Sequence, residues 1–340
     1  MKTTWWKAEE PGAVEQAGKL LREGGLVAIP TETVYGLAAN AWDSTAVEGI
    51  FAAKGRPQDN PLIIHIARES QVQELAAAVP ALAQKLFQAF WPGPLTVVLP
   101  KSSRVPSQVS GNLPTVAVRF PSHPVAQAVI QAAGVPLAAP SANRSGRPSP
   151  TSAQHVWEDL SGRIAGILDG GSCPVGVEST VVSLAQDTPR LLRPGSITVE
   201  QLRAVIGQVD VDPAVLSPLQ KETAASSPGM KYQHYAPLAR VILVEGPYAA
   251  YRDFVNSHAG PGVAALCYEG EQEGLRTDTV CFGREQDASG QARALFDALR
   301  QLDARGIRIA YARCPRQEGI GLAVYNRLLR AAGFEVIHIG

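Results

Sequence analysis

Residues 54–66, with the sequence KGRPQDNPLIIHI, place two cations beside a glycine at the end of an expected helix. Lys54 and Arg56 could grip a phosphate, because a guanidinium binds two oxygens at once and an ammonium adds a point charge. Asn60 and the proline after it turn the chain into a strand that carries His65. The alternative is an ordinary helix end, where basic side chains favour the negative end of the dipole, followed by a structural histidine.

Four further clusters of polar residues lie where expected strands begin or end. They are PTETVYGLAANA (30–41), PLAAPSANRSGRPSP (136–150), DGGSCPVGVESTVVSL (169–184) and LLRPGS (191–196). Strand ends of open α/β sheets are the usual places for ligands, and hydroxyls with backbone amides can form an anion-binding nest. Each cluster alone could equally be an ordinary turn or loop.

The distribution of charge separates one segment from the rest of the chain. The 340 residues carry 31 basic and 31 acidic side chains, so the net charge is zero. Residues 75–157 nevertheless contain no Asp or Glu, and their basic residues are Lys85, Lys101, Arg104, Arg119, Arg144 and Arg147. This imbalance indicates either a local anion site or a solvated basic face.

Several familiar motifs are missing. The chain has no GxxxxGK[ST] phosphate loop, no GxGxxG between a strand and a helix, no HExxH and no GxSxG, which disfavours the common nucleotide and hydrolase folds. The four cysteines show no metal-ligand or redox spacing and are typical of a reduced cytoplasmic protein. We find neither a signal peptide nor an apolar stretch long enough for a membrane helix.

Helix and strand signals alternate over the first two hundred residues. Helices are expected at 13–23, 44–54, 70–78, 80–90, 123–133, 151–159 and 198–206, and strands at 26–29, 62–66, 95–99, 115–119, 136–139, 164–168 and 179–184. Periodicity weakens after residue 208 in a stretch rich in Pro, Ser and Ala, which indicates a linker. A second alternation of strands and helices starts at residue 240 and predicts a smaller α/β unit with a mainly parallel sheet.

Taken together, the clusters resemble the YrdC-type domain of L-threonylcarbamoyl-adenylate synthases. The KGR, NPL and histidine residues match its signature, and the TETVYGL, PGPLT, SAN-SG and VEST segments match in the same order. Residues 227–239, SPGMKYQHYAPLA, resemble the segment that joins the two domains in the long form of that family. The resemblance implies a catalytic domain at 1–208, a linker at 209–239 that folds over the active site, and a C-terminal domain at 240–340.

The resemblance also implies the fold and the site. The fold would be a twisted open mixed α/β sheet with a deep basic cavity, followed by a smaller Rossmann-like α/β domain. Threonine would be bound by Thr33, His65, Arg119, Ala139 and Ser179. ATP would be bound by Arg56, Asn60, Thr115, Ser141, Ser149, Arg193 and Tyr232. Lys54 and Arg56 would be the catalytic cations, with Lys54 on phosphate or bicarbonate.

The implied reaction joins L-threonine, bicarbonate and ATP into threonylcarbamoyl-adenylate and pyrophosphate, for modification of the tRNA adenosine next to the anticodon. It demands positioning and charge neutralisation more than a protein nucleophile. Mg²⁺ would accompany ATP, and no metal site of the protein itself is expected. A downstream threonylcarbamoyl-transferase complex is the expected partner, with no membrane, a cytoplasmic location and stable tRNA binding left open.

Two other functions compete with this interpretation. An RNA-binding or ribosome-assembly module could use the same basic cavity, but residues 1–209 carry nearly balanced charge. An enzyme that activates a carbamoyl group made elsewhere would be expected to carry zinc-finger and acylphosphatase-like domains, and the chain has no CxxC pair. The oligomeric state and the role of the C-terminal domain stay open.

Overall fold

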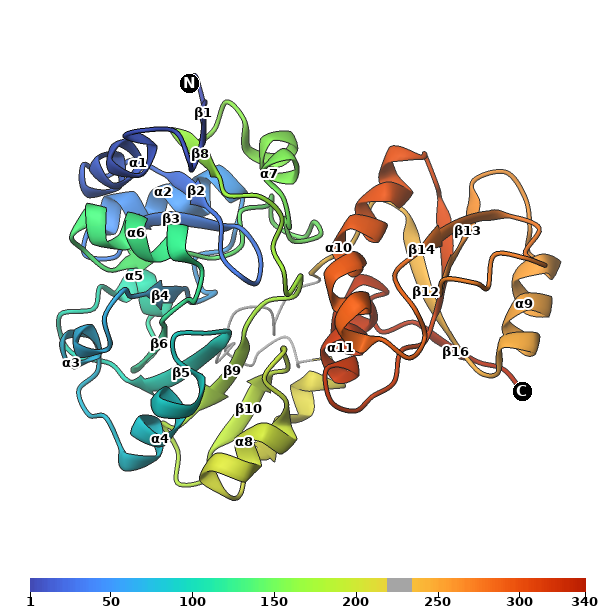
Figure 1. Cartoon of the computed structure of the whole chain (residues 1–340). Coiled ribbons are helices and arrows are strands. Elements are labelled where there is room, and N and C mark those ends of the chain that lie inside the picture. The colour runs from blue at the N-terminus through green and yellow to red at the C-terminus, as the bar shows by residue number, and fades with distance from the viewer. Residues whose placement is uncertain (219–233) are drawn as a thin grey trace.

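Two β-sheets organise the chain, one on each side of a narrow waist (Figure 1). The structure is a computed structural model, and it describes residues 1–218 and 234–340. Residues up to Val215 supply the larger sheet and its helices, and residues from Arg240 supply the smaller one. The N-terminal body therefore carries all of the expected motif clusters up to residue 196.

The larger sheet is mixed and has eleven strands in the order β1-β8-β2-β3-β7-β4-β6-β5-β9-β10-β11. It contains both parallel pairs, such as β4 with β6, and antiparallel pairs, such as β5 with β6. The strands are β1 (Thr4–Lys7), β2 (Val27–Ile29), β3 (Gly36–Asn40), β4 (Ile63–His65), β5 (Leu95–Pro100), β6 (Thr115–Arg119), β7 (Leu137–Ala138), β8 (Gly166–Asp169), β9 (Thr180–Ser183), β10 (Arg190–Arg193) and β11 (Asp210–Val211).

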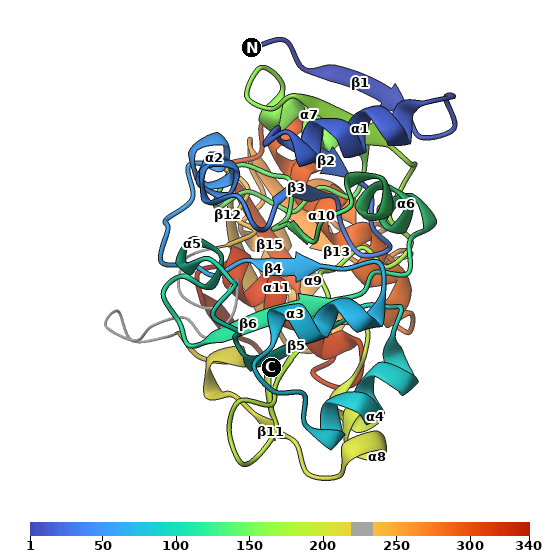
Figure 2. The same cartoon turned by 90° about the vertical axis from the view of Figure 1, so that its left-hand side faces the viewer.

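Helices cover this sheet, and their apolar faces complete its core (Figure 2). They are α1 (Ala13–Arg22), α2 (Ser44–Lys54), η1 (Glu69–Gln71), α3 (Val72–Leu75), α4 (Ala81–Phe90), α5 (Ser107–Ser110), α6 (Pro124–Ala133), α7 (Ala153–Leu160), α8 (Val199–Ile206) and η2 (Pro213–Val215). Helix α2 shows how capping sets the site. Asp43 accepts hydrogen bonds from the amides of Thr45 and Ala46, and Gly55 ends the helix in the left-handed region at φ 63°. This termination fixes the cations on either side of Gly55.

The smaller sheet has five strands in the order β14-β13-β15-β12-β16, and its recorded strand pairs are all parallel. Its elements are β12 (Arg240–Glu245), α9 (Tyr248–Ser257), β13 (Val263–Cys267), β14 (Asp278–Cys281), α10 (Ala288–Ala304), β15 (Ile309–Arg313), α11 (Gly321–Ala331) and β16 (Val336–His338). Helices α10 and α11 lie on the side that faces the N-terminal body (Figure 1). Parallel sheets need both faces covered, and the helices supply that cover.

The expected fold class is confirmed: a mixed open sheet is followed by a smaller parallel α/β domain. Sequence periodicity did not anticipate the edge strand β1, and the expected helix at 70–78 is a short turn, η1, followed by four residues of α3. The segment expected to be a linker from residue 209 begins on the sheet instead. Asp210 and Val211 pair with β10, and residues 219–233 lie outside the described residues.

Among residues 1–218 and 234–340, no helix has both the length and the apolar composition needed to cross a membrane. The four cysteines are all free, and two of them, Cys173 and Cys267, are buried.

Candidate active site

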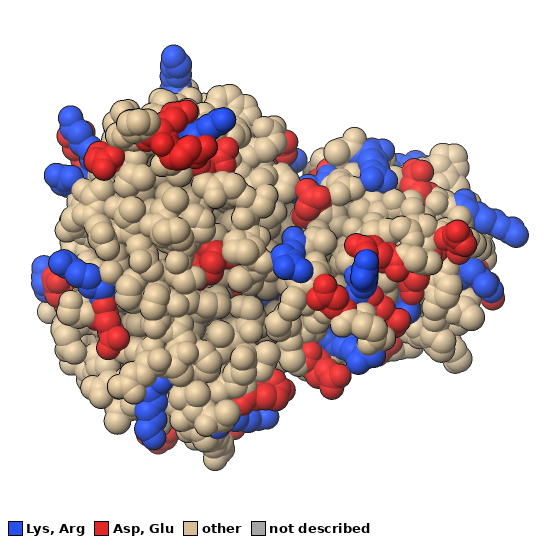
Figure 3. Space-filling view, in the orientation of Figure 1, with Lys and Arg blue, Asp and Glu red and all other residues tan. Residues whose placement is uncertain are grey.

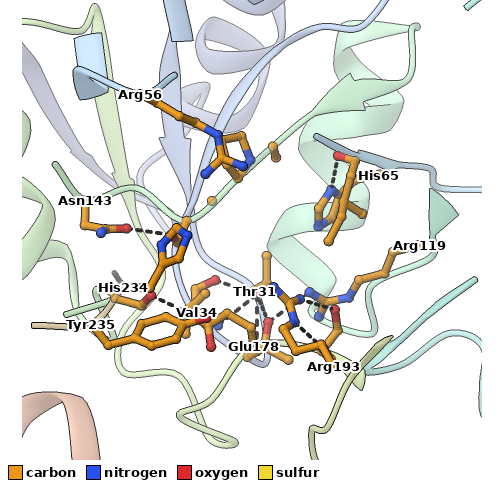
Figure 4. A pocket seen from close by; sticks show the side chains of 18 of the residues that line it. Thr31, Val34, Arg56, His65, Arg119, Asn143, Glu178, Arg193, His234 and Tyr235 are labelled. Carbon is orange, nitrogen blue, oxygen red and sulfur yellow. Dashed lines mark hydrogen bonds between the residues drawn. The ribbon is translucent and has the colours of Figure 1, made fainter. Parts of the chain in front are cut away.

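A pocket opens among the loops at the ends of the large sheet's central strands (Figure 4). Four arginines and one carboxylate lie in its lining, so the pocket favours an anionic ligand. The lining residues are Thr31, Thr33, Val34, Gly36, Arg56, Ile63, His65, Arg119, Ala139, Pro140, Ser141, Asn143, Arg147, Ser149, Glu178, Ser179, Arg193, His234 and Tyr235.

Arg119 is held rigidly at the end of β6. Its Nη2 forms an ion pair of 2.7 Å with Glu32, and its Nη1 donates to the hydroxyl of Thr33 at 2.9 Å. The Thr33 hydroxyl also lies 2.9 Å from that of Thr31. Burial by itself raises the pKa of Glu32, but the charge of Arg119 holds that pKa below its ordinary value. A buried guanidinium oriented in this way can receive a carboxylate in a defined geometry.

His65 is neutral in this pocket. Burial and the charge of Arg119 lower the pKa of His65 to about 3. Its Nδ1 lies 3.2 Å from the carbonyl oxygen of Ile63. Because a carbonyl only accepts, Nδ1 carries the proton and Nε2 is left as a hydrogen-bond acceptor. His65 and Arg119 are directly paired in the β4–β6 register, so an acceptor and a donor stand side by side.

Ser179 and Arg193 form a second fixed unit. Arg193 donates from Nε to the Ser179 carbonyl at 3.0 Å and from Nη2 to the Ser179 hydroxyl at 3.1 Å. The Ser179 hydroxyl also lies 2.8 Å from that of Thr96. Both side chains are buried, so their positions are set before any ligand enters.

Lys54 supports the loop between β7 and α7, residues 139–152, which carries Ser141 and Ser149 and is called the serine loop below. Its ammonium donates to the carbonyls of Ser141 and Asn143, and the side chain is 3% exposed. Asn143 in turn accepts from the Ser141 hydroxyl and donates to the carbonyl of Arg147. Lys54 does not lie among the lining residues of this pocket, so its contact with a substrate stays a prediction.

Arg56 reaches into the pocket from the end of α2, on the opposite side from Tyr235 (Figure 4). Its Nη2 donates to the carbonyls of Asn60 and Pro61. Asn60 is 1% exposed, and both polar atoms of its side chain lack a hydrogen-bond partner among the described residues. An orphaned buried amide is costly, so it indicates a ligand that would satisfy it.

The structure brings most of the predicted residues together. All five residues expected to bind threonine line the pocket, and of those expected to bind ATP, Arg56, Ser141, Ser149 and Arg193 line it. Asn60 and Thr115 lie outside its lining, and Tyr232 lies outside the described residues. Two cations of the acid-free segment, Arg119 and Arg147, are among the lining residues.

His234 and Tyr235 occupy one wall of the pocket (Figure 4). Tyr235 adopts φ 65°, a strained value for a side chain other than glycine. The amide of the next residue, Ala236, donates to the carbonyl of Gly146 at 2.8 Å. Tyr235 packs on Phe296 at a centroid distance of 5.3 Å. His234 and Tyr235, at the end of the inter-domain segment, therefore lie within the site.

Two acids at the site were not anticipated from sequence. Glu32 pairs with Arg119, and Glu178 accepts from Ser149 and pairs with Arg327 of the C-terminal domain. A signal for both exists, because each is a lone acid inside a hydroxyl-rich motif beside a strand. No sequence motif around Arg327 predicts its role, because it lies in the middle of a helix, α11.

Comparison with known proteins finds matches over nearly the whole chain. Residues 19–195 match a family described as telomere recombination, and residues 197–333 match one described as threonylcarbamoyl-AMP synthase, C-terminal domain. The threonylcarbamoyl-AMP synthase of Pyrococcus abyssi is 48% identical, with 97% of each chain covered. That of Bacillus subtilis is also 48% identical, covering 95% of this chain and 94% of its own.

A solved structure is similar to the same extent. The structure of P. abyssi Sua5 complexed with L-threonine matches with a TM-score of 0.92 and 45% identity, over 100% of both chains.

Proposed function

This chain belongs to the threonylcarbamoyl-AMP synthase family, and we propose that its pocket holds L-threonine at the strand ends and ATP on the loops. The enzyme uses ATP to make L-threonylcarbamoyl-AMP, the activated group for threonylcarbamoyl modification of tRNA. One observation carries the placement of threonine: Thr33, His65, Arg119, Ala139 and Ser179, from five separate segments, line a single pocket. Its likeness to a relative complexed with L-threonine supports it.

We call the part of the pocket lined by Thr33, His65, Arg119, Ala139 and Ser179 the strand-end half. Threonine fits this half by charge and by hydrogen bonding. The carboxylate of threonine meets the guanidinium of Arg119, and the Nε2 acceptor of His65 suits the amine or the hydroxyl. The amine then attacks bicarbonate to give a carbamate, with loss of water. Only the uncharged amine can attack bicarbonate, and cations held close to it favour that form over the ammonium.

ATP occupies the loop half. We assign its phosphates to Arg56 and Arg193 and its remaining contacts to Ser141 and Ser149, with Asn60 turning its unsatisfied amide to the nucleotide. A carbamate oxygen attacks the α-phosphorus, the bond to the β-phosphate oxygen breaks, and pyrophosphate leaves. The guanidinium groups stabilise the charge that develops on the phosphates.

Mg²⁺ enters this scheme as part of the ATP substrate. Among the described residues, no group of three His, Cys, Asp or Glu side chains could hold a metal ion. The two acids at the pocket, Glu32 and Glu178, are already paired with arginines. The ligands of the ion would therefore be phosphate oxygens and water.

The catalytic domain at 1–208 and the C-terminal domain at 240–340 are joined by a segment that we assign as a cover for the site. The position of His234 and Tyr235 in the pocket wall supports this role. A carbamate hydrolyses readily, so excluding water at the reaction step has a clear use. The proposed contact of Tyr232 with ATP belongs to the same segment.

The alternative of an RNA-binding or ribosome-assembly module finds no support. The relatives that cover the full chain are named as synthases. On the face shown in Figure 3, basic and acidic side chains are interspersed and do not gather into a basic patch, as nucleic-acid binding would require. We place the enzyme in the cytoplasm, where it would supply a threonylcarbamoyl-transferase complex acting on tRNA.

One assay tests the whole scheme. Pyrophosphate release from ATP should require both L-threonine and bicarbonate, and the product should carry the mass of threonylcarbamoyl-AMP. Release that persists without threonine, or without bicarbonate, would contradict the proposed reaction.

A further inference from the structure

We infer that Arg327, a residue of the C-terminal domain, is a positioning residue for the ATP half of the pocket. The inference rests on the proposed function, because it takes Ser149 and Arg193 as ATP contacts. It gives the C-terminal domain a role in the reaction: its helices add supports to two loops of the catalytic domain.

Arg327 lies on α11 and is completely buried. Its Nε forms an ion pair of 3.0 Å with Glu178, and its Nη2 donates to the Glu178 carbonyl at 3.2 Å. Its Nη1 donates to the carbonyl of Pro194, the residue after Arg193. One guanidinium therefore joins the two segments that carry Ser179 and Arg193, with three bonds in a fixed plane.

Glu178 passes this constraint on to the serine loop. Its Oε1 accepts a hydrogen bond from the Ser149 hydroxyl, while Oε2 faces Arg327. Burial raises the pKa of Glu178, but the charges of Arg327 and Arg193 hold it below its ordinary value. The carboxylate thus stays ionised and remains an acceptor for Ser149. Without Arg327 it would be a buried charge that has lost its main partner.

A second arginine supports the same loop from its other side. Arg300, on α10, donates to the carbonyl of Pro148 at 2.7 Å and to Asp159 at 2.8 Å. Asp159 also binds Arg147 at 3.0 Å. The two residues before Ser149, Arg147 and Pro148, are therefore both connected to Arg300 of the C-terminal domain. Loops lack the continuous backbone pairing of strands, so such side-chain supports determine their geometry.

The strand-end half of the pocket has different supports. The contacts of Arg119 with Glu32, Thr33 and Gly93 all come from the catalytic domain. Ser179 is the exception, because it follows Glu178, but its hydroxyl also contacts that of Thr96 in the catalytic domain. Loss of Arg327 should therefore weaken ATP binding much more than threonine binding. A purely structural role at the domain interface would disturb both ligands in parallel.

Calorimetry on the full-length chain tests this selectivity, with ATP and L-threonine titrated separately. Arg327→Met should weaken ATP binding at least tenfold and change threonine binding less than threefold. Arg327→Lys should fall between wild type and Arg327→Met, because an ammonium keeps the charge opposite Glu178 but cannot make all three bonds. In a double-mutant cycle, Arg327→Met and Ser149→Ala should be non-additive in ATP affinity.

Asp297→Asn is the matched control. Asp297 lies on α10 and forms an inter-domain ion pair of 3.3 Å with His155. Among the described residues, Asp297 bonds to His155 and Gln301 and not to Ser149, Glu178 or Pro194. This variant removes a contact across the same interface and should bind both ligands like the wild type. Melting temperatures should be recorded for every variant, so that loss of folding is seen directly.

ATP affinity equal to that of wild type in Arg327→Met would overturn the inference, and so would equal losses for ATP and threonine. If Arg327→Met does not fold, Arg327→Lys decides, and unchanged ATP affinity there would have the same meaning. Failure of the proposed function has a different signature: Ser149→Ala would bind ATP as tightly as the wild type.

Discussion

The two halves of the pocket are held in place by different means. In the threonine half, His65 and Arg119 stand at paired positions of β4 and β6, and the ion pair of Arg119 with Glu32 is internal to the catalytic domain. In the ATP half, Ser149 lies on a loop and Arg193 ends β10 directly before a loop. These loops contact Arg300 and Arg327 of the C-terminal domain.

The difference has a physical origin. Strand positions are fixed by backbone ladders, so their side chains need only local partners. Loops have no ladder, and each must be fixed by individual side-chain bonds. A site that combines both kinds can therefore couple one substrate more strongly than the other to a second domain.

The largest effect should come from breaking the threonine half. Arg119→Met leaves Glu32 buried without its partner, so the free energy of unfolding should fall by about 3–5 kcal/mol, and threonine binding should be lost. Denaturant unfolding and calorimetry measure the two effects. The double variant Glu32→Gln with Arg119→Met should recover part of the stability, because it removes the unpaired charge. No recovery would show that the ion pair is not the source of the loss.

Acid should weaken both halves through their two carboxylates. The folded-state pKa values of Glu32 and Glu178 lie below the ordinary value of 4.5. Their ion pairs therefore contribute full stability above that pH and lose it as the pH falls through the folded pKa. Each carboxylate can cost up to about 1.4 kcal/mol per pH unit in this window. Thermal melts of wild type and Glu178→Gln from pH 7 to pH 3 test this, since the variant should show the smaller acid dependence.

Arg56→Ala should separate the halves from the ATP side. A charged hydrogen-bonded contact is worth about 1.5–3 kcal/mol, so ATP affinity should fall by that amount while threonine affinity changes little. Calorimetry with each ligand measures the contrast. Unchanged ATP affinity would mean that the KGR segment only ends a helix.

The smallest expected effect concerns the fit of threonine itself. Serine lacks one methyl group, and the lost contact should raise the activation free energy by about 1 kcal/mol. Pyrophosphate release at limiting amino acid should be slower by the corresponding factor. Valine, which lacks the hydroxyl, should also be a poorer substrate. Equal rates with all three amino acids would contradict the assignment of the strand-end half.

The order of strands and helices was largely predictable, because it depends on local patterns. The apolar run 115–119 became β6 with the expected bounds, and the glycine after Lys54 ends α2 at the expected residue. The short strand β11 was not predictable, because two residues have no periodicity and pair only when β10 stands beside them. The edge strand β1 likewise depends on β8, far along the chain.

By itself, the sequence determined which residue types surround the pocket and in which order the motifs occur, since those are properties of short segments. Only the tertiary structure decided which groups meet. Lys54 points to two backbone carbonyls, Arg119 is already paired with Glu32, and Arg327 reaches Glu178 from 149 residues away. The first two pairings follow from packing within the catalytic domain and the third from the packing of one domain on the other, and no local preference of the chain encodes them.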